Sequence, residues 1–175
     1  MEIGQGLRFL NLNNCFILQI SFLSSLLGRF MITIGRKDKI DLPELGFFDI
    51  DAKVDTGAYG SALHCHHVEV IERDGQPVLS FKVLDPTHPE YDDKPIFVSN
   101  FSDKVVKSSS GRAEHRYTIR TKVVIFKKKR TVEFSLTDRQ EMKYPVLLGR
   151  KFLRKRFLVD VQHIDLSYNL KNNKA

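Results

Sequence analysis

The chain has 175 residues and a mass of 20.2 kDa, enough for one domain whose hydrophobic core requires neither metal ions nor disulfides. Its two cysteines, Cys15 and Cys65, exclude a disulfide framework and favour a reducing compartment or indifference to redox conditions. The formal charge of +7 permits an acidic partner, such as nucleic acid, an anionic membrane or an acidic peptide, without specifying which.

The first 30 residues differ in character from the rest of the chain. The apolar run at 16–27 has the length of a signal-peptide core and is too short to span a bilayer. Only one cation, Arg8, precedes it, and Met31 opens a segment that reads as an ordinary protein start. We therefore predict a domain at 31–175, preceded at 1–30 by an over-extended start, a signal peptide or an interfacial anchor. The protein is expected to be cytoplasmic, or exported or membrane-anchored if residues 1–30 act as a signal or an anchor.

The pattern after this segment is nearly all β-strand. Apolar residues alternate with charged ones at 48–54, so that Phe48, Ile50, Ala52 and Val54 are expected on one face. Similar runs predict strands at 62–71, 78–84, 96–99, 117–126, 131–136 and 157–161, with turns at 74–75, 85–86, 108–111 and 127–130. A short helix is predicted only at 151–156. These elements predict an all-β fold, a closed or nearly closed antiparallel β-barrel, because closure removes exposed strand edges.

The strand at 48–54 leads directly into a triplet of Asp55, Thr56 and Gly57. Alone, this triplet is typical of a turn that ends a strand. A carboxylate can also act as general base toward water if a second, nearby carboxylate holds a shared proton. In such a pair Asp55 supplies the oxygen, Thr56 can form a hydrogen bond across the pair, and Gly57 permits close backbone approach. The sequence holds one such triplet, so a pair requires two chains related by a two-fold axis.

A second motif strengthens this interpretation. The apolar run Leu147-Leu148 precedes Gly149 and Arg150, 95 positions after Asp55. Together the two motifs resemble the signatures of the retropepsin-like aspartic proteases. The core from about residue 31 to 161 is similar to the family labelled ATP-dependent zinc proteases, which occurs with ATP-grasp glutamate ligases that modify a ribosomal protein. The resemblance rests on residues 42–46, 53–58, 61–64, 110–111 with Glu114 and Arg116, 121–123, 133–153 and 157–161.

The resemblance implies roles for single residues in a retropepsin-like barrel. Asp55, Thr56 and Gly57 would form the active-site loop, and Ala58 and Arg150 would contact substrate. Leu147, Leu148 and Gly149 would support the loop from beneath, and Arg150 would open the short helix. Viral members of the fold carry Asp or Asn where this chain has Lys151, which puts the role of that position in doubt. The long spacing between the motifs leaves room for a mobile flap within about 85–116.

Neither zinc nor ATP is predicted by the residues themselves. The sequence lacks a Walker loop, a dinucleotide-binding glycine turn and an H-E-x-x-H motif. His64, Cys65, His66 and His67 are consecutive, but on a strand His64 and His66 point one way while Cys65 and His67 point the other. His64 and His66 are therefore only weak metal candidates, and a strand with surface histidines and a buried thiol is the expected structure. No cofactor is predicted.

The basic runs at 127–130 and 151–156 do not by themselves indicate nucleic-acid binding. The first lies between two apolar strands, where a solvated hairpin turn is expected. The second could extend a basic surface toward ribosomal RNA or an acidic polypeptide, although a charged helix face is expected first. The chain has no Trp and no aromatic residues interleaved with these runs, so stacking on single strands is not expected.

Three functions are consistent with the sequence. The first is a homodimeric aspartic endopeptidase of retropepsin type that acts on polypeptides through paired Asp55 carboxylates. The second is a non-catalytic barrel that binds a polypeptide or a ribosome-linked partner, because fold alone does not confer function. The third is the zinc-dependent peptidase of the family label. The expected partners are a polypeptide substrate and a second copy of the chain, with an association with ribosomal proteins or glutamate ligases implied by the family.

Overall fold

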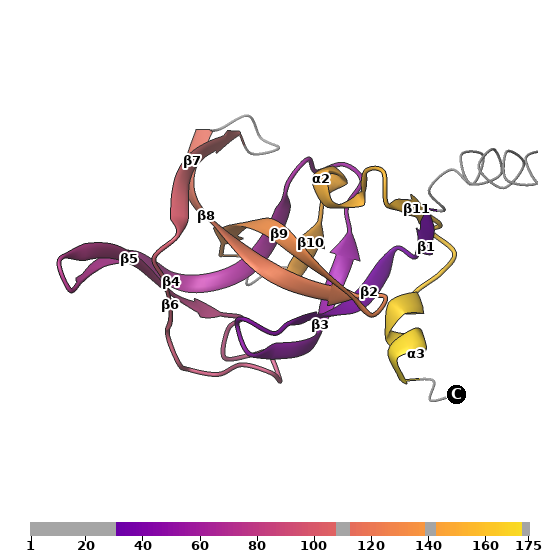
Figure 1. Cartoon of the computed structure of the whole chain (residues 1–175), viewed down its shortest axis with the longest axis horizontal. Coiled ribbons are helices and arrows are strands. Elements are labelled where there is room, and N and C mark those ends of the chain that lie inside the picture. The colour runs from indigo at the N-terminus through magenta and orange to yellow at the C-terminus, as the bar shows by residue number, and fades with distance from the viewer. Residues whose placement is uncertain (1–30, 108–112, 139–142, 173–175) are drawn as a thin grey trace, which may run out of the picture. The chain divides into compact units, whose positions relative to one another are not determined.

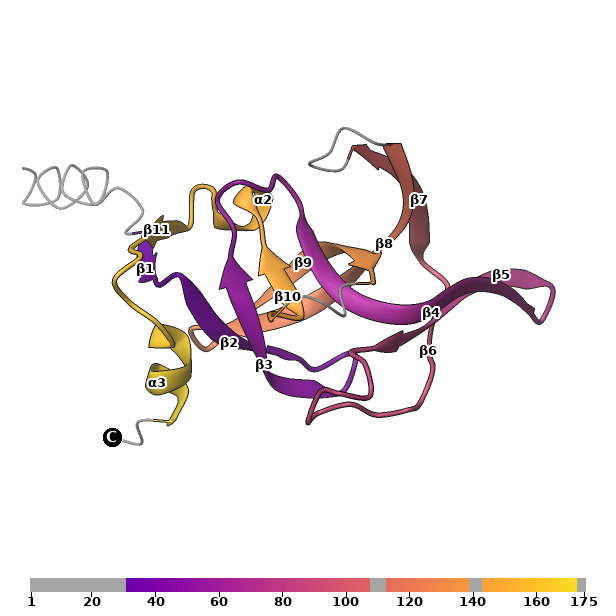
Figure 2. The same ribbon diagram turned by 180° about the vertical axis from the view of Figure 1, so that it is seen from behind.

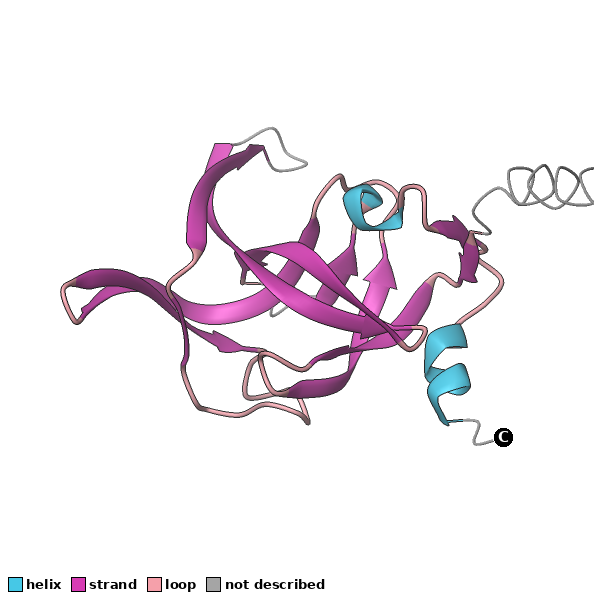
Figure 3. Cartoon of the chain, viewed as in Figure 1, coloured by secondary structure: helices cyan, strands magenta, loops and turns pink. Residues whose placement is uncertain are grey.

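The computed structural model describes residues 31–107, 113–138 and 143–172, and it is built mainly from strands (Figure 3). The predictions for residues 1–30 lie outside this part of the chain. The elements, labelled in Figure 1, are β1 (Ile32–Ile34), β2 (Lys37–Leu42), β3 (Phe47–Val54), β4 (Ser61–Arg73), β5 (Gln76–Val83), β6 (Ile96–Val98), β7 (Phe101–Lys107), β8 (Ala113–Ile125), β9 (Lys128–Thr137), β10 (Val146–Leu148), α2 (Arg150–Leu153), β11 (Phe157–Val159) and α3 (Leu166–Asn172).

Six strands close into a barrel in the order β10, β3, β2, β8, β9 and β4, with β4 pairing back onto β10. The predicted closed, all-β barrel is confirmed. Two of its contacts are parallel, however, because β10 pairs parallel with β3 and β9 pairs parallel with β4. The prediction of an antiparallel barrel is wrong at these two contacts. Each joins strands that are far apart in the sequence, so local turn signals could not reveal it.

The barrel interior is apolar, as the alternation of the strands predicted. Ile40 on β2, Ile50 on β3, Leu63 on β4 and Phe134 on β9 are at most 1% exposed. Burying one side chain of this size contributes about 1.5–3 kcal/mol. These side chains form part of one continuous hydrophobic core inside the barrel.

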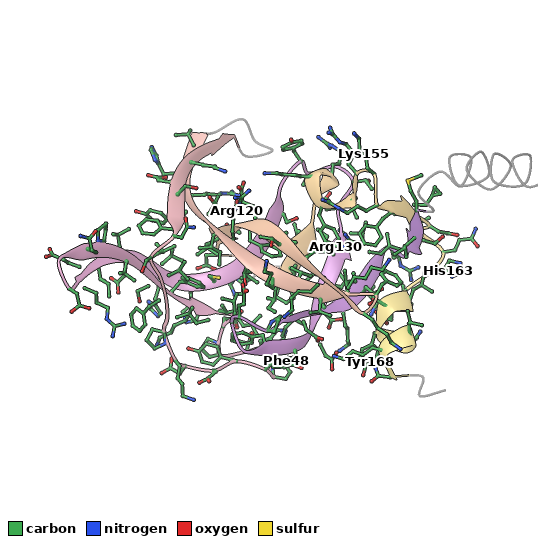
Figure 4. All side chains as sticks on the ribbon, in the orientation of Figure 1. Phe48, Arg120, Arg130, Lys155, His163 and Tyr168 are labelled. Carbon is green, nitrogen blue, oxygen red and sulfur yellow. The ribbon has the colours of Figure 1, made fainter. Side chains whose placement is uncertain are left out.

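One residue of β3 faces the opposite way from its prediction. Phe48 was expected to point inward with Ile50, but it is 56% exposed, whereas Phe47 is buried (Figure 4). The cause is a local break in the alternation. Asp49 has a positive φ of 55°, and the pairing of β2 with β3 shifts register at the same point.

The strand β4 is longer than the barrel needs, and with β5 it forms a projecting hairpin (Figure 2). Its turn is Asp74-Gly75, with φ values of 52° and 71°. Two consecutive positive values are typical of the tight turn that joins twisted strands. The hairpin turn predicted at these two residues is confirmed.

The helix prediction was incomplete. The helix after Gly149 is present but ends at Leu153, and a second helix, α3, follows near the C-terminus. α3 depends on the buried Asp38 of β2, whose carboxylate accepts hydrogen bonds from the backbone N–H groups of Ser167 (2.8 Å) and Tyr168 (3.0 Å). Burial raises the pKa of Asp38, and these hydrogen bonds oppose the rise. Asp38 lies more than 120 residues from the helix it caps, so no local pattern predicted α3.

Candidate active site

Asp55 begins the loop that connects β3 to β4. Its backbone N–H donates to the carbonyl oxygen of Leu148 (3.0 Å), which ties the loop to β10. One carboxylate oxygen, Oδ1, accepts hydrogen bonds from the N–H groups of Gly57 (3.0 Å) and Ala58 (3.1 Å). Among the described residues, Oδ2 receives no hydrogen bond. The half-buried carboxylate is thus fixed through one oxygen, while the other remains available for a reaction.

The backbone of β10 and α2 supports the loop from beneath. Leu147 and Leu148 are buried in β10, which inserts between β3 and β4. At the start of α2, the N–H groups of Arg150 and Lys151 donate to the carbonyl oxygens of Ala58 and Tyr59, both at 2.9 Å. The structure therefore brings together the two motifs that are distant in sequence.

Gly149 lies where no larger residue fits. A Cβ atom at this position would lie 2.1 Å from the carbonyl oxygen of Gly60 and 2.9 Å from that of Tyr59. The backbone N–H of Gly149 also donates to the Ser61 hydroxyl oxygen (3.2 Å), a buried contact that the sequence did not point to. Close approach of two backbone segments thus explains the glycine.

The side chain of Arg150 is exposed and also supports the Asp55 loop. Its Nη1 atom donates to the carbonyl oxygens of Thr56 (3.0 Å) and Gly57 (2.7 Å). Ala58 is half-buried, and both its backbone N–H and its carbonyl oxygen are used within the site. Substrate contacts of Arg150 and Ala58 stay predictions. Thr56 is exposed, so its bond across a pair of carboxylates also stays a prediction.

The segment predicted to hold a flap contains β6, β7 and the first part of β8. β7 pairs with β8 as a hairpin from Phe101↔Ile119 to Lys107↔Ala113, and the connection at 108–112 lies outside the described residues. In both Figure 1 and Figure 2, this hairpin and the β3–β4 loop rise at the same end of the barrel. This arrangement is compatible with a cover over Asp55, and the mobility of such a cover stays a prediction.

The two weak metal candidates, His64 and His66, each have a hydrogen-bond partner within the protein. His64 is 3% exposed, and its Nε2 lies 2.9 Å from Asp85 Oδ2. His66 Nδ1 lies 2.6 Å from the carbonyl oxygen of Leu84, so one ring nitrogen of each histidine is already engaged. Within the described part of the chain, no three His, Cys, Asp or Glu side chains are arranged to hold a metal ion.

The strand alternation expected for these histidines fails at a bulge. His67 has a positive φ of 50°, and the pairing of β4 with β5 shifts register between His66 and Glu69. As a result, the His66 and His67 rings, which were expected on opposite faces, are neighbours with centroids 4.6 Å apart. His64 was expected on the surface and is instead buried, whereas the buried thiol of Cys65 is as expected.

The pairing of His64 with Asp85 leads to a prediction about pH. Hydrogen bonds from Thr87, together with the His64 contact, hold the pKa of Asp85 below its ordinary value of 3.8. A carboxyl group whose pKa is lower in the folded state than in the unfolded state stabilises the fold at pH values above its unfolded-state pKa. This contribution is lost as the pH falls toward its folded-state pKa. Asp85→Asn is therefore expected to lower the free energy of unfolding by about 1–3 kcal/mol near neutral pH, and by less below pH 3.8.

Urea unfolding of both forms over this pH range measures the effect. Asp92→Asn, at an exposed carboxylate of the same segment, is the matched control and is expected to change the free energy of unfolding by less than about 0.5 kcal/mol. A difference between wild type and Asp85→Asn that grows on acidification would contradict the assigned direction.

The comparisons agree with the fold. A family model described as RimB-like, retropepsin-like aspartic endopeptidase RimB, matches residues 33–167. The chain belongs to this family. The RimB-like match spans both the Asp55 loop and the Gly149-Arg150 turn, and the retropepsin-like barrel is thereby confirmed.

Curated relatives of this RimB-like chain carry a different name. A probable alpha-L-glutamate ligase of Desulfotalea psychrophila is 34% identical over 131 residues, covering 73% of this chain and 27% of the relative. A probable alpha-L-glutamate ligase of Parasynechococcus marenigrum is 35% identical over 133 residues, covering 74% of this chain and 28% of the relative. The chain thus spans about a quarter of the length of these curated relatives.

A solved structure shows the same fold. It is a Legionella pneumophila protein of unknown function (DUF785), with a TM-score of 0.57 and 26% identity over 78% of this chain and 98% of that one. Within the described residues of the RimB-like chain, no helix has the length and hydropathy needed to cross a membrane.

Proposed function

We propose that this RimB-like chain is an aspartic endopeptidase whose active form is a homodimer with Asp55 facing its own copy. The observation that carries the proposal is the state of the Asp55 carboxylate, with Oδ1 held by two backbone N–H groups and Oδ2 available. One chain supplies one such carboxylate, and a two-fold axis through the loop would supply the second. Membership of a retropepsin-like aspartic endopeptidase family supports the same general chemistry.

In the proposed dimer, one Asp55 is ionised and the other is protonated, because two adjacent carboxylates cannot both keep their charge. The ionised group takes a proton from water as the water oxygen bonds to the peptide carbonyl carbon. The protonated group gives its proton to the carbonyl oxygen. The two Asp55 groups have now exchanged protonation states. As the tetrahedral intermediate collapses, one of its hydroxyl groups gives a proton to the Asp55 that is now ionised, and the Asp55 that is now protonated gives its proton to the peptide nitrogen while the C–N bond breaks. The products are an amine and a carboxylic acid, and the pair again holds one proton.

The supports of the loop give this mechanism its fixed geometry. Hydrogen bonds from Gly57 and Ala58 orient Oδ1, and Arg150 donates to the carbonyl oxygens of Thr56 and Gly57 in the same loop. A catalytic group that is already positioned does not have to be ordered during the reaction. The proposed partners are a polypeptide substrate, a second copy of the chain and, from the names of the relatives, a glutamate ligase.

Mixing active and inactive chains tests the shared site. After subunit exchange with Asp55→Asn chains, each wild-type chain finds a wild-type partner in proportion to the wild-type fraction. Peptide cleavage per wild-type chain is therefore expected to fall to about one half at equal amounts, and to about one tenth with a ninefold excess of the variant. Initial cleavage rates of a fluorogenic peptide library measure this.

Two results would contradict the proposal. Cleavage per wild-type chain that is unaffected by the variant would place the complete site in one chain. Absence of cleavage by wild type over a range of protein concentrations would favour the non-catalytic binding module instead. A variant with intact Asp55, Asp74→Asn, serves as the mixing control, since it changes only an exposed hairpin turn.

A further inference from the structure

The buried ring of His64 lies between two carboxylates that follow different strands. Its Nε2 atom lies 2.9 Å from Oδ2 of Asp85, which comes after β5, and its Nδ1 atom lies 4.0 Å from Oδ1 of Asp138, which directly follows β9. The His64 side chain is 4% exposed, whereas that of Asp138 is 62% exposed. Both ring nitrogens thus face carboxylates, an arrangement that the proposed reaction does not use.

The backbone of His64 joins this region to the start of β10. Its N–H donates to the Pro145 carbonyl oxygen (2.7 Å), directly before β10, and its carbonyl oxygen accepts from the Leu84 N–H (3.1 Å). β10 has three residues, and the carbonyl oxygen of its last one, Leu148, accepts the Asp55 N–H (3.0 Å). His64 therefore holds one end of a short strand whose other end holds the Asp55 loop.

The protonation state of His64 determines how many carboxylates the ring can bind. Hydrogen bonds from Thr87, together with the His64 contact, lower the pKa of Asp85 and keep it ionised near neutral pH. An ionised carboxylate only accepts, so the hydrogen in the Nε2 contact belongs to the ring. The neutral ring has no second hydrogen, whereas the charged ring presents one on Nδ1 toward Asp138.

The described charged side chains that face the ring, Asp85 and Asp138, are both acidic. On β4 itself the next titratable ring is that of His66, whose Nδ1 lies 2.6 Å from the Leu84 carbonyl oxygen. The segment that enters β10 contributes the uncharged Pro145. Burial opposes a charged ring, and the two carboxylates act against that effect. The charged ring therefore draws the ends of β5 and β9 toward one point.

We propose that His64 is a positioning residue for the proposed active site, and that its charged form holds β10 and the Asp55 loop most firmly. In this form both carboxylates bind the ring, so the ends of β5 and β9 are fixed together beside the start of β10. As the pH rises, the ring loses the Nδ1 proton and with it the attraction to Asp138. The effect on cleavage rests on the proposed function, whereas the effect on the loop does not depend on the reaction.

Hydrogen exchange of the Asp55 amide, followed by NMR in the full chain from about pH 5 to pH 8, tests this without an activity assay. After correction for the intrinsic pH dependence of exchange, protection of this amide is expected to fall about twofold as the pH rises, with the midpoint of the His64 ring titration. Asp138→Asn removes one carboxylate and is expected to lower that midpoint by about 0.3 pH units. The matched control Glu90→Gln removes a carboxylate 2.9 Å from the ring of another histidine, His88, and is expected to leave the midpoint unchanged.

His64→Gln provides a second measurement. Glutamine can donate a hydrogen bond to Asp85 but cannot take up a proton, so the pH dependence of Asp55 protection is expected to disappear. If this variant does not fold, Asp138→Asn decides alone, because its side chain is exposed and its loss leaves the buried contact in place. The pH profile of kcat for peptide cleavage is expected to shift in the same direction in Asp138→Asn as the ring titration.

Protection of the Asp55 amide that does not change with pH, or that has the same midpoint in wild type and Asp138→Asn, would overturn the proposal, because His64 would then only fill space. A pH dependence that persists in His64→Gln would overturn it as well, since another group would carry the effect. The two proposals can fail separately. Protection that follows the His64 titration in a wild type that cleaves no peptide would remove only the endopeptidase, and cleavage with pH-independent protection would remove only the role of His64.

Discussion

Asp55→Asn is expected to reduce peptide cleavage at least about a thousandfold while the barrel remains folded. The amide keeps an oxygen that can accept the hydrogen bonds of Gly57 and Ala58, so the loop keeps its shape. It cannot take a proton from water, however, and cannot share one with a second Asp55. Cleavage rates on a peptide library measure the first expectation. Circular dichroism and urea unfolding measure the second.

Asp74→Asn is the matched control for this substitution. Asp74 directly precedes Gly75 in the β4–β5 hairpin turn, where Asn tolerates the positive φ of 52°. This variant is expected to cleave at the wild-type rate. Unchanged cleavage by Asp55→Asn, or a loss that appears only with a chelator, would be incompatible with aspartic catalysis. Equal losses in both variants would point to a general effect of the lost charge.

Gly149→Ala is expected to have the largest effect on the free energy of unfolding, a loss of at least about 2 kcal/mol. The new methyl group would lie 2.1 Å from the Gly60 carbonyl oxygen, so the Asp55 loop and the start of α2 would have to separate. That movement breaks the hydrogen bonds from Arg150 and Lys151 to the loop. Activity is therefore expected to disappear together with stability. Urea unfolding and cleavage assays on the same preparation measure both.

Gly60→Ala, on the opposite side of the same contact, is the control for this effect. A Cβ atom at Gly60 meets nothing within 4 Å, and its φ is not in the positive range. We expect a change of less than about 0.5 kcal/mol in the free energy of unfolding. A Gly149→Ala protein as stable as Gly60→Ala would show that the loop adapts easily, and would remove the physical reason for the glycine.

Much of the barrel was predictable because its strands alternate. The runs that became β4, β5, β8 and β9 were found in the sequence, and their buried faces follow from a period of two. The prediction failed where tertiary contacts overrode the local pattern. Asp49, with its positive φ, turned Phe48 outward, and Asp38, an acidic residue in a strand, is buried because it caps α3.

The site was predictable only where its residues lie in contiguous motifs. Asp55 and Gly149 were found because each belongs to a short signature of the retropepsin-like proteins. The contact of the Ser61 hydroxyl with the Gly149 N–H was not predicted, and neither was the His64–Asp85 pair. These contacts depend on which strands are neighbours in the barrel, and the parallel pairs of β10 with β3 and of β4 with β9 could not be read from one sequence.

The position of β10 determines when the site can form during synthesis. This strand of three residues separates β3 from β4 and ties the Asp55 loop through Leu148, yet it follows Asp55 by some ninety residues. A chain still growing on the ribosome has already exposed the Asp55 triplet, but it has no strand with which to close the barrel. Because the chain emerges from its N-terminus, the carboxylate is oriented only after nearly the whole domain is available. An unfinished chain therefore carries Asp55 without the contacts that hold its loop in place.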